Sequence, residues 1–219
     1  MKEIIAFVHA KGNSMRLPGK NMRKLGGLPL FCHATFNAHK TISIKKAVID
    51  SDSDEILKIG ERCGAVPLKR PSHLANNDTD GNALAYWAAI NYPDSKIIVQ
   101  ISPTAPFLHP SSIDDAISLL LEKGVDSVAG VFKDVFYEWV NGKPAYFVNG
   151  KIPNSFNKNY VIYETMGLCV VRTEFVLTHH KRLNANSCLP YFLSRLESID
   201  INTIEDFRFA EIVWRGMRG

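Results

Sequence analysis

The stretch IIAFVHAKGNSMRLPGKN, residues 4–21, joins an apolar strand-like run to a loop suited to an anion. Its first part, Ile4–Val8, is a short apolar run of the kind that forms a strand covered on both faces. A loop of small residues follows and carries three cations, Lys11, Arg16 and Lys20. Because such a loop lets backbone N–H groups approach a polyphosphate while cations neutralise its charge, we expect a nucleotide-binding loop after the first strand.

Two better-known phosphate-binding loops do not fit this stretch. Six residues separate Gly12 from Gly19, whereas a Walker loop has four, and Lys20 is followed by Asn21 in place of Ser or Thr. The dinucleotide-binding glycine triplet that opens a helix is also missing from the sequence. The loop therefore argues against kinases, GTPases and NAD enzymes.

Further apolar runs alternate with helical patterns, which predicts an α/β, Rossmann-like fold with a mostly parallel sheet and helices on both faces. The predicted strands after the first are Ile44–Ile49, Lys96–Ile101, Val125–Val131 and the later run Leu168–Val171. The predicted helices are Leu30–His39, Asp52–Cys63, Asn82–Asn91, Ile113–Lys123 and a closing helix near Thr203–Trp214.

The alternation breaks over residues 132–163, where turn signals at Asn141-Gly142 and Asn149-Gly150 separate short aromatic and β-branched runs. We interpret this stretch as a hairpin-rich insertion in a single domain spanning residues 1–219. Its aromatic side chains are suited either to a second subunit, making a homodimer, or to packing on the parent domain; they are Phe136, Tyr137, Trp139, Tyr146 and Phe147.

Composition and charge narrow the class of protein. The 219 residues are 46% hydrophobic, contain no apolar run of membrane-spanning length and show no cleavable signal pattern, so we expect a soluble, cytoplasmic protein without a membrane partner. The four cysteines have no metal-ligand spacing, which favours buried thiols in a reducing compartment.

The positive charge is concentrated near the N-terminus. Between Glu3 and Asp50 there is no acidic residue and eight of the 26 lysines and arginines, so the rest of the chain holds 18 basic against 22 acidic residues. This stretch should face an anion. Nucleic acid is a poor candidate, because the cations are not interleaved with exposed aromatics.

Five sequence blocks along the chain together carry a family resemblance. The first is the loop Ala10–Asn21, and the second is the acidic segment Asp52–Ile56 after the second predicted strand. The others are Arg70, Pro71, Leu74 and Ala75; the turn of Pro103, Thr104 and Pro106; and the ending Ser198–Thr203 with Glu205 and Asp206. In this order the five blocks resemble the CMP-sialic acid synthetase (acylneuraminate cytidylyltransferase) family.

The resemblance implies an enzyme that moves CMP from CTP to the hydroxyl of a sialic acid-like sugar acid, releasing pyrophosphate, for cell-surface glycan synthesis. It implies that Lys11, Ser14 and Lys20 contact the triphosphate, with Asn21 and Arg70 near the base and ribose. Lys11, Lys20 and Asp200 would be catalytic, and Asp200 with Asn202 would bind Mg²⁺. The remaining residues of the implied binding site are Ala10, Gly12, Arg16, Ser102 and Thr104.

The chain departs from the family pattern at several positions. Asn202 stands where the family has a second aspartate, Met15 where it usually has lysine, and Ser102 where a glutamine is common. These departures leave alternatives open: an enzyme for Kdo or another unusual acceptor, or a catalytically impaired homologue that only binds the nucleotide. Asp206 and Glu205 are also explained as first-turn acids of the last helix.

Overall fold

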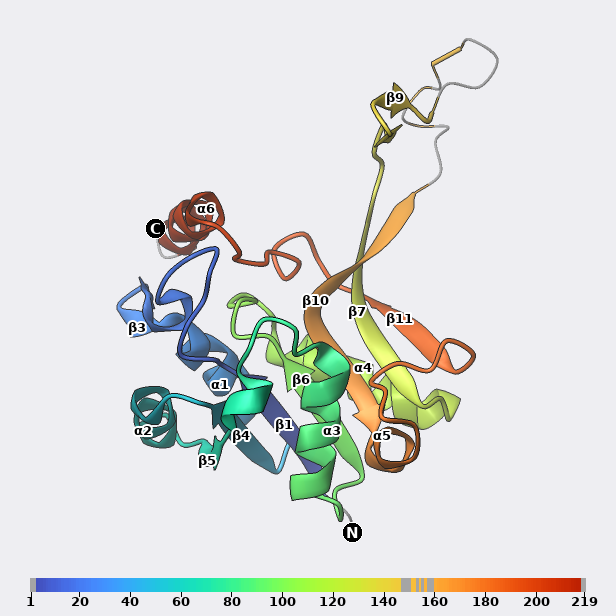
Figure 1. Ribbon diagram of the computed structural model, residues 1–219. Helices are drawn as coiled ribbons and strands as arrows, with labels where there is room; N and C mark the ends of the chain where they lie inside the picture. Colours follow the sequence, from blue (N-terminus) through green and yellow to red (C-terminus); the bar gives the residue numbers. More distant parts are fainter. Residues whose placement is uncertain (1–2, 147–150, 153, 155, 157–159, 218–219) are drawn as a thin grey trace.

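The computed structural model describes residues 3–146, 151, 152, 154, 156 and 160–217. A seven-stranded sheet forms its centre, in the order β11-β7-β10-β6-β1-β4-β5 (Figure 1). The strands are β1 (Ile4–His9), β4 (Lys46–Ser51), β5 (Val66–Lys69), β6 (Ile97–Ile101), β7 (Ser127–Asp134), β10 (Val161–Arg172) and β11 (Cys188–Phe192).

The sheet is mostly parallel, as predicted. β1 runs parallel to β4 and β6, β4 to β5, and β7 to β11, whereas β10 is antiparallel to both of its neighbours. The α/β fold class is therefore confirmed. β5 and β11 were not predicted, since each is short, contains a proline and lies on an edge of the sheet, where only one neighbour and partial burial are needed.

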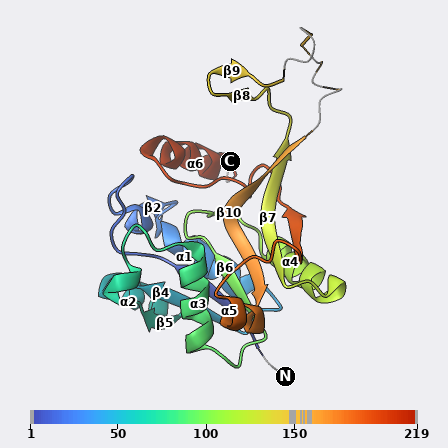
Figure 2. The same cartoon turned by 45° about the vertical axis from the view of Figure 1, so that its right-hand side comes forward.

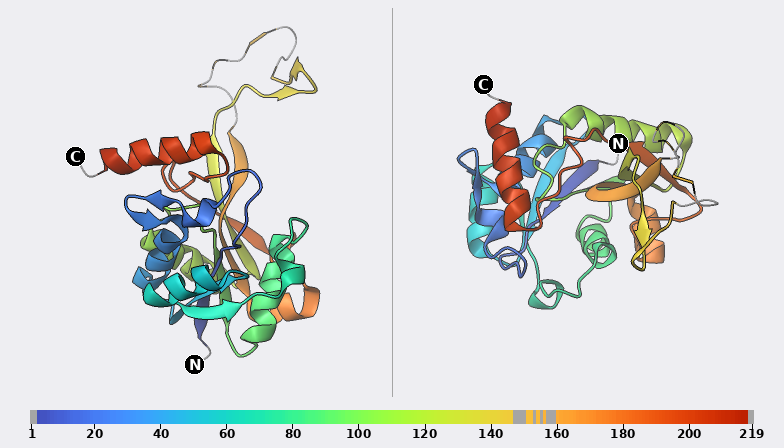
Figure 3. Two further views of the ribbon diagram at one scale, coloured as in Figure 1. Left: turned by 60° about the vertical axis from the view of Figure 1, so that its left-hand side comes forward. Right: turned by 90° about the horizontal axis from the view of Figure 1, so that it is seen from above.

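Helices cover both faces of the sheet (Figures 2 and 3). One core cluster packs strand residues such as Ala6 and Val8 against α1 (Leu30–Lys40), α2 (Asp54–Arg62) and α4 (Pro110–Lys123). The other packs Ile5 and Phe7 against α3 (Gly81–Asn91) and α5 (Thr173–His179). Because successive side chains of a strand point to opposite faces, β1 supplies both cores and is buried on both sides.

The predicted helices are confirmed with shifted ends, and their caps explain the shifts. Ser53 caps α2 and Asp80 caps α3 through side-chain acceptors, so each helix starts one residue later than its cap. Gly124, with φ of 67°, ends α4 in the left-handed conformation. α5 was not predicted; its last residue is the exposed His179.

The described part of residues 132–163 continues the sheet outward. β7 and β10 extend beyond the core as an antiparallel pair, from which the hairpin of β8 (Trp139–Val140) and β9 (Lys143–Pro144) projects (Figure 1). The predicted Asn141-Gly142 turn is confirmed, with φ of 51° and 72°, the conformation that a tight hairpin requires. Phe147 and the predicted Asn149-Gly150 turn lie outside the described residues.

The closing helix α6 (Ile204–Gly216) packs across the short hairpin β2 (Lys24–Leu25) and β3 (Leu28–Pro29) that follows the first loop. Its Phe207 and Ala210 share a core cluster with Leu17 and Leu25. The helix begins with a capping box, in which Thr203 and Asp206 exchange side-chain and backbone hydrogen bonds, so the first-turn role predicted for Asp206 is confirmed. Residues 200–203 are thereby held beside the first loop.

All four cysteines are free thiols, but the fold brings the Sγ atoms of Cys32 and Cys63 to 3.1 Å, a proximity that the sequence spacing did not indicate.

None of the helices in the described part of the chain has the length and apolar character needed to cross a bilayer.

Candidate nucleotide-binding site

A cavity of about 730 Å³ lies beyond the carboxyl ends of β1, β5 and β6. This is the edge at which ligands collect in open α/β sheets. Most of the residues proposed from the sequence line it together, although they come from four separate segments of the chain. They are Lys11, Ser14, Arg16, Lys20, Asn21, Arg70, Ser102, Thr104, Asp200 and Asn202.

Ala10 and Gly12 lie in the loop but do not line the cavity. Ala10 is fully buried, and its N–H donates to the backbone oxygen of Asp50. The N–H of Gly12 donates to Oδ1 of Asp52 at 2.8 Å. These two amides fasten the start of the loop to the end of β4 instead of facing the cavity.

Asn21 fixes the other end of the loop and keeps an unused acceptor. Its Nδ2 donates to the backbone oxygen of Lys11 at 2.8 Å, which closes the loop on itself. Its Oδ1 is buried and has no hydrogen-bond partner among the described residues. A buried acceptor without a partner is costly, so a ligand donor that reached it would recover that free energy.

Lys20 connects the first loop to the end of the chain. Its side chain is almost buried, and Nζ donates to the backbone oxygen of Ile201 at 2.8 Å and to Oδ1 of Asn202 at 3.3 Å. Burial lowers the pKa of Lys20, and the nearby carboxylate of Asp200 opposes that shift. A cation that has already lost most of its hydration acts more strongly on a phosphate than one in water.

Asp200 and Asn202 are the candidates for a metal site. Nδ2 of Asn202 donates to Oδ2 of Asp200, while its Oδ1 accepts from Lys20. Within the described ranges, no group of three His, Cys, Asp or Glu residues is placed to hold a metal. Mg²⁺ is nevertheless commonly bound by one or two carboxylates together with substrate phosphates, so Asp200 fits an ion that a triphosphate helps to hold. Asn202 can serve as a second ligand to that ion only if its amide oxygen turns away from Lys20.

The remaining cations border the cavity more loosely. Nζ of Lys11 donates to Oδ1 of Asn77 at 2.6 Å, and Arg16 is exposed. Met15 is 74% exposed and also lines the cavity. Asn77 was not foreseen, because an asparagine in a polar stretch gives no signal in a sequence.

Arg70 belongs to a buried polar cluster that sequence analysis missed. Its guanidinium is paired with Asp50, which also accepts hydrogen bonds from His9 and Trp87. His9 lines the cavity, but Asp50 lies behind it. The sequence held one signal for this cluster, which is that Asp50 follows the apolar residues of β4. An ionised side chain that is buried at such a position must find a partner.

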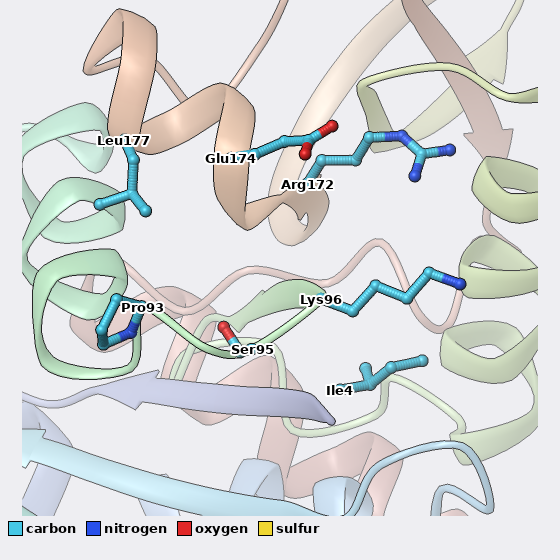
Figure 4. A pocket seen from close by; sticks show the side chains of 7 residues that line it. All are labelled: Ile4, Pro93, Ser95, Lys96, Arg172, Glu174 and Leu177. Carbon is cyan, nitrogen blue, oxygen red and sulfur yellow. The ribbon is translucent and has the colours of Figure 1, made fainter. Parts of the chain in front are cut away.

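A second cavity, of about 640 Å³, lies at the amino ends of β1 and β6 (Figure 4). Lys96 and Arg172 border it, together with Glu174. Arg172 donates through Nε to the backbone oxygen of Val125 at 2.9 Å. This cavity is remote from the first loop and from Asp200, so it is not part of the candidate nucleotide-binding site.

An α/β sheet with a cation-lined cavity at its carboxyl edge defines a nucleotide-binding protein. The chain belongs to the cytidylyltransferase family, whose model matches residues 5–184. The resemblance to CMP-sialic acid synthetases drawn from its motifs is therefore confirmed, and with it the assignment to the nucleotidyltransferases.

Similar proteins agree with this assignment. The CMP-N,N'-diacetyllegionaminic acid synthase of Legionella pneumophila is 28% identical over 95% of this chain and 94% of its own length. The N-acylneuraminate cytidylyltransferase of Escherichia coli is 25% identical over 95% of this chain, which spans only 51% of that relative. The fold is similar to that of CMP:2-keto-3-deoxy-manno-octonic acid synthetase complexed with CTP, with a TM-score of 0.75, 11% identity and coverage of 99% of this chain and 100% of that structure.

Proposed function

We propose that this protein transfers CMP from CTP to the hydroxyl of a sialic acid-like nonulosonic acid and releases pyrophosphate. The observation that carries the proposal is the convergence of Lys11, Arg16 and Lys20 with Asp200 on one cavity. The similarity to the Legionella pneumophila legionaminic acid synthase supports the choice of acceptor class.

The cavity offers the groups that such a transfer requires. The acceptor oxygen attacks the α-phosphorus, the bond from that phosphorus to the pyrophosphate oxygen breaks, and the hydroxyl proton passes to solvent. Lys20 and Lys11 stabilise the negative charge that grows on the departing pyrophosphate. Asn21, with its unpartnered buried Oδ1, and Arg70 hold the base and ribose end.

Mg²⁺ is part of the proposal. When bound, it neutralises phosphate charge and orients the triphosphate. Asp200 holds it from the protein side, and Asn202 assists if its Oδ1 leaves Lys20. With one carboxylate at the cavity, we expect the ion to bind much more tightly with CTP than without it.

We further propose a homodimer formed through the extended β7–β10 arm, in the cytoplasm. The arm exposes large apolar side chains in a small area, which is typical of an interface. Exposed apolar side chains among the described residues of the arm include Trp139 at 64%, Val140 at 57% and Ile162 at 52%. The four free thiols fit a reducing compartment.

A screen of the four nucleoside triphosphates against sialic, legionaminic, pseudaminic and Kdo acceptors, reading pyrophosphate, tests the function. We expect turnover with CTP and a nonulosonic acid, and little with ATP, GTP or UTP. Turnover with Kdo alone would move the protein to the alternative acceptor. Turnover that prefers another nucleotide would contradict the proposal.

A catalytically impaired nucleotide binder remains the second candidate, because Asn202 occupies a carboxylate position of the family and donates to Asp200. Such a protein would gain thermal stability from CTP and release no pyrophosphate with any acceptor. The same screen, run beside a melting experiment with CTP, separates the two.

A further inference from the structure

Arg70 presents a buried cation at the wall of the nucleotide cavity. It follows β5, and only 4% of its surface is exposed, although it lines the cavity. Burying a guanidinium without a partner would be prohibitively costly. The way in which its charge is balanced therefore decides where its donors point.

Asp50, which is completely buried, supplies that balance. Arg70 donates to Oδ2 of Asp50 through Nε at 2.9 Å and through Nη2 at 2.5 Å, and Nη2 also reaches the backbone oxygen of Asp50 at 3.1 Å. These bonds use one edge of the guanidinium. Its second terminal nitrogen, Nη1, has no recorded hydrogen bond to the part of the chain that the structure describes, so it is available to a ligand in the cavity.

Two more donors contact the carboxylate of Asp50. Nε1 of Trp87 donates to Oδ1 at 3.1 Å, and Nδ1 of His9 lies 2.7 Å from Oδ2. Burial lowers the pKa of His9, with Asp50 opposing the shift, so the imidazole is neutral and must have one protonated nitrogen.

Gln100 determines which nitrogen of His9 carries that proton. Its Nε2 donates to the backbone oxygen of Gly81 at 3.2 Å, which fixes the orientation of the amide. The same Nε2 lies 3.2 Å from Nε2 of His9, so that nitrogen accepts and Nδ1 donates to Asp50. Asp50 thus receives four donors, three on Oδ2 and one on Oδ1, all of them from side chains of this buried cluster.

We propose that Asp50 is a positioning residue, held by His9 and Trp87, which fixes Arg70 so that Nη1 contacts the nucleotide. The assignment rests on the proposed function, because it takes CTP as the ligand. Asp50 acts only through Arg70. Its contribution therefore belongs to nucleotide binding in the ground state as much as in the transition state, and the KM for CTP depends on it more than kcat does.

The test is a set of four proteins: wild type, Asp50→Asn, Arg70→Gln and the double variant. We expect Asp50→Asn to raise the KM and Kd for CTP by about tenfold or more, as befits a charge-assisted hydrogen bond, with kcat within about twofold. In the Arg70→Gln background, Asp50→Asn should add nothing to either constant. The double variant should melt at a higher temperature than Asp50→Asn, since it buries no unpaired charge.

Asp114→Asn is the matched control. Asp114 accepts the backbone N–H groups of Ile42 and Ser43 and lies outside the cavity, so its loss should lower stability and leave the KM for CTP unchanged. If Asp50→Asn behaved in the same way, Asp50 would be merely structural and the proposal would be overturned. Independent, additive effects of Asp50→Asn and Arg70→Gln on the KM would overturn it as well.

If Asp50→Asn alone does not fold, Trp87→Phe replaces it in the test. This substitution removes one hydrogen bond from Asp50 and leaves the Asp50–Arg70 charge pair in place. It should raise the KM for CTP by a smaller factor, and a KM equal to that of wild type would refute the proposal. Calorimetry separates this failure from that of the proposed function. Wild type without CTP binding overturns both, whereas wild type and Asp50→Asn binding CTP equally overturn only the role of Asp50.

Discussion

Replacing Lys20 with methionine should abolish most turnover while leaving the fold intact. The substitution keeps the length of the side chain and removes its charge. Two hydrogen bonds are lost, to the backbone oxygen of Ile201 and to Asn202. Leaving the oxygen of Ile201 unpaired costs about 1–3 kcal/mol.

An opposing effect limits the loss of stability. Because burial lowers the pKa of Lys20, keeping its ammonium charged in the folded state costs free energy of folding at neutral pH. Methionine removes that cost. We therefore expect a net change in unfolding free energy of about 1 kcal/mol, or a Tm shift of roughly 2–4 °C for a chain of this size.

The effect on catalysis should be far larger. Removing one preorganised donor from a charge that develops in the transition state typically lowers kcat by about 10²–10³-fold, or about 3–4 kcal/mol. Pyrophosphate release at saturating CTP measures kcat, and a melting curve measures Tm. Lys24→Met, at an exposed lysine of β2, is the control and should retain wild-type kcat.

A Lys20→Met enzyme with normal kcat would refute the assignment of Lys20 to the leaving group. Lost turnover with a Tm lowered by more than about 10 °C would instead show that Lys20 mainly holds the closing segment at residues 200–203 in place.

Three other changes should have distinct signatures. Asp200→Asn should raise the magnesium concentration for half-maximal turnover by about tenfold or more, or 1.4 kcal/mol, and an unchanged requirement would remove Asp200 from the metal site. Gly60→Ala should destabilise by about 1–3 kcal/mol in urea unfolding, because a Cβ there would lie 2.5 Å from Ile49, whereas Gly216→Ala has open space and should not destabilise. Burial disfavours the charged form of Glu197, but hydrogen bonds from neighbouring hydroxyls and amides outweigh it and hold its pKa below the usual value. The stability that the Glu197 carboxylate contributes should be fully present above the ordinary glutamate pKa and lost as the pH falls. In a plot of unfolding free energy against pH, Glu197→Gln should make the decline at acidic pH less steep. An unaltered decline would contradict this role of Glu197.

Much of the fold was predictable because its central strands are apolar on both faces. Ile4–Val8 and Lys96–Ile101 correspond closely to β1 and β6, whose alternate residues enter two different cores. β11 was not predicted because its residues, Cys188–Phe192, include a proline and are only partly buried. Tertiary pairing with β7, which a local pattern does not encode, makes it a strand.

The site was predictable where charge is concentrated in one segment. The loop cations could be assigned because no acid accompanies them between Glu3 and Asp50. The Asp50 cluster could not, because its members lie on β1, β4, β6 and α3 and meet only in the folded chain. The bond from Lys20 to Ile201, 181 residues apart, was invisible for the same reason.

Titration of CTP with magnesium into the wild-type protein by calorimetry tests the central claim most directly. We predict saturable binding at one site per chain, with CTP bound more tightly than ATP, GTP or UTP, since the cavity that contains Lys20 and Arg70 is assigned to that nucleotide. No binding heat with any of the four nucleotides would contradict the account.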